Sequence, residues 1–254
     1  MALQEVDRHW PRTGNVDQVA EIRKHFPEHY CVYGPGVDMH AETASPADPA
    51  RRQFGNMVLS RYPVVFSRNH LLPKLGSIEA LSVQRSSLET TLDANGTLLR
   101  VSSLHLSHLS TADRMPQVER ILALHRDARR EGSPVQGDLE GKDYQDGVGN
   151  QGVADHALLL GDFNCQPDSP EYLAIVGPLS DYGGHITSEA GFVDAWTCCG
   201  GDKSTGHTSD VNDLPARLDY CFASTLLRER LKNCWVDTAA TGSDHLPLWV
   251  ELDI

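Results

Sequence analysis

The sequence predicts one domain with a mixed α/β sandwich fold. Three observations support this prediction: strand-like apolar runs recur along the chain, helices and long loops join them, and a hairpin is present. A chain of 254 residues can bury a substantial core. Neither an internal repeat nor an interdomain linker interrupts it, so residues 1–254 are expected to form a single unit.

The first part of the chain alternates predicted strands with a helix and a loop. Ala2–Val6 reads as a buried strand that ends in polar groups. Asn15 is placed to cap a helix that Pro27 stops, and residues 34–53 are expected to form an irregular polar loop. Two strand-like segments follow, Phe54–Ser60 and Tyr62–Phe66.

The clearest β signal lies between residues 77 and 106. Ser86–Leu92 alternates polar and apolar side chains, Leu98–Leu106 is largely apolar, and Asn95-Gly96 between them suits a tight hairpin turn. A helix with Val118, Ile121, Leu122 and His125 on one face is predicted next, ending at Gly132.

The remaining segments complete an alternating pattern. Residues 132–156 are rich in Gly, Asp and Gln and are predicted to be a surface loop insertion. A short apolar strand is predicted at Ala157–Leu160, and Ser169-Pro170 begins a helix. The last strand-like segments are Leu218–Ala223, Cys234–Val236 and Leu246–Leu252.

Composition narrows the function classes. The formal net charge of −13 argues against a nonspecific nuclease, which usually offers a basic surface to phosphates. No apolar run approaches the ~20 residues that span a bilayer. The six cysteines show no CxxC pair and no finger-like Cys/His spacing, so they are expected to be reduced thiols. A structural zinc protein, the alternative raised by 12 His and six Cys, has no supporting ligand spacing.

An apolar strand delivers an acid and an amide at its C-terminal end. Asp162 and Asn164 follow Leu158-Leu159-Leu160-Gly161, and side chains two residues apart in a strand share a face. An acid and an amide on one face can align a water and donate a hydrogen bond to a developing phosphoryl charge. The alternative is a strand-to-turn junction, where Asp and Asn commonly cap the backbone.

Two further segments place charges beside predicted strands. Asp244 and His245 precede the final strand, where they could supply a metal-facing carboxylate and an acid/base imidazole, although an isolated His in a surface loop is often incidental. Arg217 and Asp219 lie in a buried-looking strand. Alternation puts both on one face, so a simple ion pair between them and a functional role for Asp219 both stay open.

These segments fall into an ordered set of motifs. Gly-Asp-Phe-Asn stands at 161–164, Arg-Leu-Asp-Tyr at 217–220 and Ser-Asp-His at 243–245. Leu-Gln-Glu-Val stands at 3–6, Gly-Asn-Met-Val-Leu-Ser-Arg-Tyr-Pro at 55–63, and Ser-Leu-His-Leu at 103–106, followed by Arg114 and Gln117. In type and order all six resemble the DNase-I-like endonuclease/exonuclease/phosphatase superfamily. The resemblance covers essentially the whole chain and implies a four-layer sandwich of two packed mixed or antiparallel sheets flanked by helices.

The resemblance also implies roles, position by position. Glu5 is similar to the principal metal-binding glutamate, which would hold Mg²⁺, with Mn²⁺ as a substitute, and Asp244 to a further metal-site carboxylate. Asp162 resembles the residue that activates the attacking water, and Asn164 the one that steadies the phosphoryl oxygens. The other roles fall to His245 as acid/base, Asp219 as the group that orients it, His105 as a phosphate ligand, and Asn56, Arg61 and Arg217 as supporting residues. His108 matches no family motif and is interpreted as an ordinary polar residue.

The N-terminus departs from the family pattern. Members normally begin with an earlier strand that bears an asparagine near the metal, so the resemblance predicts an N-terminally truncated domain. Cytoplasmic location is the default expectation, and export stays open because a missing N-terminus would take any export signal with it.

The resulting prediction is a divalent-metal-dependent phosphoester hydrolase of the phosphodiesterase type. With a net charge of −13, a small or lipid-borne phosphodiester is favoured over long nucleic acid as substrate. The alternatives are a nuclease of the same superfamily and a catalytically impaired binding scaffold.

Overall fold

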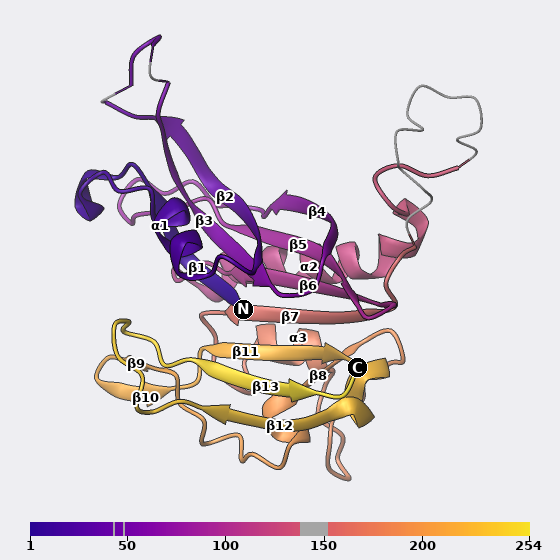
Figure 1. Ribbon diagram of the computed structural model, residues 1–254. Coiled ribbons are helices and arrows are strands. Elements are labelled where there is room, and N and C mark those ends of the chain that lie inside the picture. Colours follow the sequence, from indigo (N-terminus) through magenta and orange to yellow (C-terminus); the bar gives the residue numbers. More distant parts are fainter. Residues whose placement is uncertain (43, 48, 138–151) are drawn as a thin grey trace.

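A six-stranded sheet forms the centre of the molecule (Figure 1). The computed structural model describes residues 1–42, 44–47, 49–137 and 152–254. The strand order of the central sheet is β4-β5-β6-β7-β11-β8, and β6 and β7 are parallel. Its strands are β4 (Val64–Leu71), β5 (Ser86–Ala94), β6 (Thr97–His105), β7 (His156–Asp162), β8 (Phe192–Asp194) and β11 (Asp219–Ser224).

Smaller sheets cover one face of the central sheet. One has the strand order β1-β3-β2, with β1 (Ala2–Arg8), β2 (Tyr30–His40) and β3 (Arg51–Ser60). Another pairs β12 (Leu231–Val236) with β13 (Leu248–Leu252). A short hairpin of β9 (Ser209–Val211) and β10 (Leu214–Ala216) lies beside them in Figure 1.

Helices complete the layers. The helix α1 (Gln18–His25) packs on the β1 sheet, whereas α2 (Thr111–Glu131) and α3 (Pro170–Val176) lie behind the central sheet in Figure 1. The short helix α4 (Ala195–Cys198) and two 3₁₀ turns, Pro11–Thr13 and Thr225–Arg230, link other elements. The sequence-based prediction of a layered α/β sandwich is confirmed.

Strand alternation divides the core between the two faces of the central sheet. Leu104 and Leu159 point to the helix side and pack with Ile121 of α2 and Ile175 of α3. Leu158, one residue away from Leu159, points to the opposite side, where it packs with hydrophobic residues of β12 and β13. Alternation along β7 therefore puts Leu158, Leu160 and Asp162 on the face that the smaller sheets cover.

Local signals in the sequence explain several element ends. Asn95 and Gly96 have φ of 56° and 92° between β5 and β6, as the predicted hairpin turn requires. Ser169 accepts a hydrogen bond from the Tyr172 N–H at the start of α3, and Gly132 follows the last turn of α2. The first helix is capped by Asp17, not by Asn15, because the Asp17 side chain accepts from the Ala20 N–H.

Two expectations about the N-terminal half are only partly right. Residues 34–53, expected to be an irregular loop, contribute to β2 and β3, and the expected strand at Tyr62–Phe66 begins at Val64. Gly34-Pro35-Gly36 reads as a turn, yet it lies in an edge strand, where Pro is tolerated. The glycines serve close packing instead: a Cβ on Gly36 would lie 2.5 Å from the Gln84 carbonyl oxygen, and a Cβ on Gly55 of β3 would lie 2.3 Å from the Gly34 carbonyl oxygen.

The predicted loop insertion at 132–156 is only partly described. Residues 133–137 and 152–155 contain no helix or strand, and residues 138–151 lie outside the described part of the chain. All six cysteines are free thiols, as expected. Among the described residues, no helix combines the length and apolar character needed to cross a membrane.

Close contact between β6 and β7 depends on Gly161. Its φ is 135°, and a Cβ there would lie 2.0 Å from the carbonyl oxygen of Leu104, its partner in the parallel ladder. Real Cβ atoms do not approach backbone oxygen so closely. A side chain at this position would therefore force β7 away from β6, directly before Asp162.

We predict that Gly161→Ala lowers the free energy of unfolding by about 1–3 kcal/mol, the usual cost of overpacking. The matched control is Gly76→Ala, because an added Cβ at Gly76 meets no atom within 4 Å. Urea denaturation of both variants checks this. Equal stability of the two variants would show that β6 and β7 do not need the close approach.

Candidate functional site

Strand register brings three of the predicted site residues into one row. His105 ends β6 and pairs with Asp162 at the end of β7, and Asp162 in turn pairs with Asp219 at the start of β11. Neighbouring strands lie about 4.8 Å apart, and directly paired residues project to the same face. Residues 105, 162 and 219, separated widely in sequence, therefore form a polar row on the face opposite α2 and α3.

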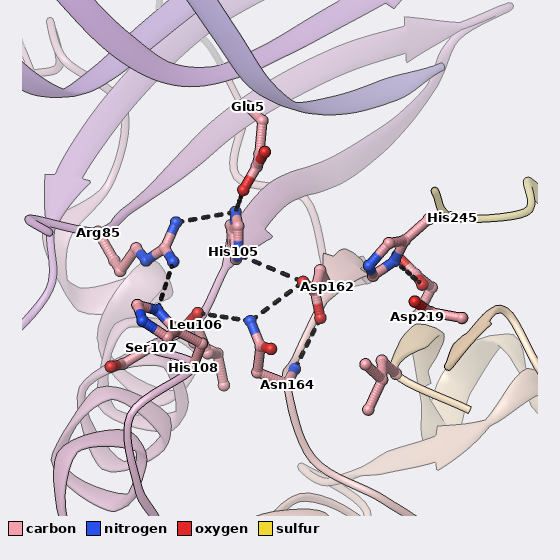
Figure 2. A network of polar contacts seen from close by, with 12 residues as sticks. Glu5, Arg85, His105, Leu106, Ser107, His108, Asp162, Asn164, Asp219 and His245 are labelled. Atoms are coloured by element: carbon pink, nitrogen blue, oxygen red, sulfur yellow. Dashed lines mark hydrogen bonds and ion pairs between the residues drawn. The ribbon is translucent and has the colours of Figure 1, made fainter. Parts of the chain in front are cut away.

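Asp162 is the centre of this row (Figure 2). Its residue exposure is only 7%, and its carboxylate accepts three hydrogen bonds or close polar contacts. The His105 Nε2 lies 3.2 Å from Oδ2, the Asn164 side-chain amide donates to Oδ2 over 3.0 Å, and the Asn164 backbone N–H donates to Oδ1 over 2.8 Å. Asn164 has a φ of 49°, which curls the chain back towards Asp162.

The surroundings keep Asp162 ionised. Burial alone would raise its pKa, but the hydrogen bond and charge of His105, the Asn164 N–H and the nearby charge of His245 hold the pKa below its ordinary value. Asn164 donates its second amide hydrogen to the Leu106 carbonyl over 3.0 Å. Both amide hydrogens of Asn164 are thus committed within the chain, and its clearest role in this structure is to hold Asp162.

Asp219 and His245 form a second pair beside Asp162. The His245 Nδ1 lies 2.7 Å from the Asp219 Oδ2, and both side chains are partly exposed. The hydrogen bond to Asp219 is the largest cause that raises the pKa of His245 to about 9, with further contributions from the charges of Asp162 and Asp244. At neutral pH His245 is therefore an imidazolium, and its Nε2–H has no hydrogen-bond acceptor among the described residues.

Glu5 reaches the row from β1 because of a β-bulge. The register between β1 and β3 shifts between Leu3 and Val6, and Glu5 has a φ of 58°. Gln4 donates to the Ser103 hydroxyl, while the Glu5 Oε1 lies 3.8 Å from the His105 Nδ1. Adjacent residues of a regular strand point to opposite faces, so the bulge is what turns both side chains towards β6.

The residues fit a partial oxygen site for a hard cation. Within the described ranges, no group of three or more His, Cys, Asp or Glu side chains is arranged to hold a metal ion. Mg²⁺, however, usually keeps several waters and takes one or two protein carboxylates, with substrate phosphates completing its shell. The Glu5 side chain is 63% exposed beside the row, which suits such a carboxylate.

Other predicted site residues lie at different distances from the row. Asn56 is buried opposite the bulge and donates to the Ser86 carbonyl over 2.8 Å, so it supports the strands that carry the site. Asp244 is exposed next to His245 and acts on it through its charge. Arg61 is exposed after β3, near the Met1 end of β1, and among the described residues it makes no contact with the row.

Arg217 does not pair with Asp219, the simple alternative that alternation left open. Its Nη1 donates instead to the Asp194 Oδ2 over 2.7 Å, and both side chains are almost fully buried. Tyr172 donates to the same oxygen over 3.0 Å. Arg217 therefore ties the segment directly before β11 to the end of β8, which leaves Asp219 available for His245.

Sequence reasoning missed two residues of the cluster. The Arg85 guanidinium lies 3.0 Å from the His105 Nδ1 and 3.2 Å from the Nδ1 of His108, the residue interpreted as an ordinary polar one. Figure 2 shows the guanidinium between the two imidazoles. The available signal was weak: an arginine stands immediately before the predicted alternating strand at Ser86–Leu92, and a cation that becomes buried requires partners.

The Asp219–His245 pair yields a direct prediction. Because the pKa of His245 is raised from 6.5 to about 9, the pair stabilises the folded state fully below about pH 6.5. This contribution disappears as the pH rises through 9. In Asp219→Asn, which removes the carboxylate charge, the pKa of His245 should fall by more than one unit towards 6.5, as measured by ¹⁵N NMR titration of the histidine side chains. An unchanged pKa in that variant would contradict the assignment of Asp219.

Comparison with solved structures places this fold among known proteins. An endonuclease/exonuclease/phosphatase from Bacteroides vulgatus matches with a TM-score of 0.63 and 17% identity, covering 100% of this chain and 84% of that one. A mannosyl-6-phosphatase from Bacteroides thetaiotaomicron matches with a TM-score of 0.57 and 16% identity over 93% and 81%. The sulfate-bound catalytic domain of human Nocturnin matches with a TM-score of 0.56 and 15% identity over 94% and 78%.

No curated protein sequence matches the chain. The family comparison is decisive, because it matches residues 1–245 to the Endonuclease/Exonuclease/phosphatase family, whose enzymes hydrolyse phosphoesters and typically use divalent metals. The chain belongs to the endonuclease/exonuclease/phosphatase family and has its DNase-I-like sandwich fold.

Proposed function

We propose that this protein is a divalent-metal-dependent phosphodiesterase that hydrolyses its substrate by in-line attack of water. One observation carries the proposal: a buried, ionised carboxylate, Asp162, lies near a partly exposed imidazolium, His245, which Asp219, the ladder partner of Asp162, holds by a hydrogen bond. At neutral pH these pKa shifts keep Asp162 ionised and His245 protonated, so a proton acceptor and a proton donor are available together for phosphodiester hydrolysis.

Each side chain has a role that its contacts support. Asp162 orients the attacking water and accepts its proton, and His105 and Asn164 hold the carboxylate in place. His245 donates its Nε2 proton to the leaving oxygen, and Asp219 stabilises the imidazolium until then. The water oxygen bonds to phosphorus as the ester P–O bond breaks, which produces a phosphomonoester and an alcohol.

The cation belongs at Glu5. Bound Mg²⁺ would supply positive charge against the negative charge that develops on the phosphoryl oxygens. The Glu5 carboxylate provides an exposed anionic oxygen at the edge of the row, and Mn²⁺ accepts the same type of ligand. Asp244 is available as a further carboxylate on the His245 side. To donate to a phosphoryl oxygen, the Asn164 amide has to give up its hydrogen bond to either Leu106 or Asp162.

For the substrate, we favour a small or lipid-borne phosphodiester over long nucleic acid. The support is the net charge of −13, which repels a polyanion outside the immediate site. A mannosyl-6-phosphatase and Nocturnin have similar folds, so the fold alone does not identify the substrate class. A panel of plasmid DNA, RNA, sphingomyelin vesicles and inositol phosphates separates the classes. Preferential cleavage of DNA or RNA would contradict the proposed substrate class and favour the alternative, a nuclease of the same family.

We predict that Asp162→Asn and His245→Ala each reduce Mg²⁺-dependent hydrolysis of bis(4-nitrophenyl) phosphate by on the order of 10²–10⁴-fold, the usual contribution of acid–base groups. The matched controls are Asp181→Asn and His40→Ala, whose side chains are exposed and lie outside the row. Initial rates at saturating Mg²⁺ make the comparison. Wild-type rates in both site variants would refute the assignment.

A second candidate is a binding scaffold without catalysis. The observation in its favour is that the described residues assemble no three-ligand metal site. Calorimetric titration with Mg²⁺ separates the two proposals. We predict measurable binding to the wild type that Glu5→Gln weakens by on the order of 10–100-fold. Absence of binding to the wild-type protein, with or without inorganic phosphate, would favour the scaffold.

A further inference from the structure

Arg85 occupies an unusual position for a cation. It directly precedes β5, its residue exposure is 5%, and burial lowers the pKa of its guanidinium. Its two terminal nitrogens contact two imidazoles, with Nη1 3.0 Å from the His105 Nδ1 and Nη2 3.2 Å from the His108 Nδ1. Arg85 takes no direct part in the proposed reaction.

The chemistry of these contacts fixes their direction. A guanidinium has five N–H donors and no acceptor, and it stays protonated in proteins. Both Nδ1 atoms must therefore accept, which requires that neither carries a proton. A neutral imidazole with an unprotonated Nδ1 carries its proton on Nε2. For His105 that proton points at the Asp162 Oδ2, only 3.2 Å away, where it donates to the carboxylate.

Without Arg85, the His105 Nδ1 would have Glu5 as its nearest polar partner among the residues that the structure describes. The Glu5 Oε1 lies 3.8 Å from the same Nδ1, so a proton on Nδ1 could donate to Glu5. The Arg85 contact is shorter and almost fully buried, whereas the Glu5 side chain is 63% exposed. Hydrogen bonds weaken steeply with distance and are stronger away from water, so the Arg85 contact prevails.

We propose that Arg85 is a positioning residue that fixes His105 and His108 in the Nε2–H tautomer. In this tautomer His105 supports Asp162 through its Nε2–H and offers no proton to Glu5. The Glu5 carboxylate is thereby left free for a cation, and this consequence rests on the proposed function. The tautomer itself does not, because it follows from the contacts alone.

The chain contains a second arginine–imidazole pair away from the site. The Arg100 Nη2 contacts the His125 Nδ1 between β6 and α2, and Arg100 is also 5% exposed. The same donor argument assigns the Nε2–H tautomer to His125 where the ring is neutral. Burial is the largest cause that lowers the pKa of His125 to about 4, so the ring is neutral at pH 8. This pair serves as an internal reference that a change at Arg85 should not affect.

The test is the tautomeric state of the histidines, read from ¹⁵N shifts and two-bond ¹H–¹⁵N couplings of the imidazoles. Spectra are recorded at pH 8 without divalent cations for the wild type and for Arg85→Met, which keeps an apolar stem but donates nothing. His105→Gln, His108→Gln and His125→Gln assign the signals. Denaturation curves and the unchanged signal of His125 show that the fold is retained.

In the wild type, His105 and His108 should both carry their proton on Nε2. In Arg85→Met, the His108 Nδ1 loses its donor, so a fraction of His108 large enough to observe should carry its proton on Nδ1. His105 should keep its Nε2–H in that variant, because the Asp162 carboxylate still accepts it. A proton on the His105 Nδ1 in the wild type overturns the proposal. Because this result comes from the wild-type spectrum alone, it tests the proposal even if Arg85→Met does not fold. A folded Arg85→Met with an unchanged His108 tautomer overturns it as well. Neither result depends on turnover, so failure here is distinguishable from failure of the proposed hydrolysis.

Discussion

The burial of one carboxylate organises this site. Asp162 is 7% exposed at the end of a strand, and a buried carboxylate without donors would be costly. Three donors stabilise this carboxylate. Strand pairing places His105 beside it, and the left-handed backbone conformation of Asn164 directs both the backbone N–H and the side-chain amide of that residue towards it. The resulting anion in turn favours the charged form of His245 nearby.

Rigid elements determine the geometry of the remaining groups. The row from His105 to Asp219 is a property of ladder register, which a shift by one residue would destroy because alternate side chains face opposite sides of the sheet. Glu5 requires the opposite, a local break in register, to reach the same row. The site is thus built from regular pairing in the central sheet and one irregularity in the sheet that covers it.

Much of this arrangement could be predicted from the sequence. Polar residues at the end of an apolar strand indicated Asp162 and Asn164, and the hairpin at Asn95-Gly96 was recognised by its turn chemistry. For Asp219 the local pattern left an ion pair with Arg217 open, and only the family resemblance implied its orienting role. The edge strand β2 was missed because Gly-Pro-Gly is typical of turns. Here close packing to β3, a contact invisible in the local sequence, decides the conformation.

Partner choice was the least predictable property. Arg217 has Asp219 two residues away, yet it binds Asp194, because tertiary packing brings the end of β8 against it. The contacts of Arg85 with His105 and His108 likewise join residues about twenty positions apart, on either side of a hairpin. Local patterns indicate which polar residues need partners, and only the assembled sheet determines which partners they obtain.

In the proposed reaction, Asp162, His245 and Glu5 serve a single phosphoryl group. A crystal structure of the protein soaked with Mg²⁺ and inorganic phosphate tests this claim most directly. We expect phosphate bound to the His245 Nε2 within reach of Asp162, with the cation between the phosphate and Glu5. Phosphate bound elsewhere on the surface, with these three side chains unligated in the same crystal, would contradict the account.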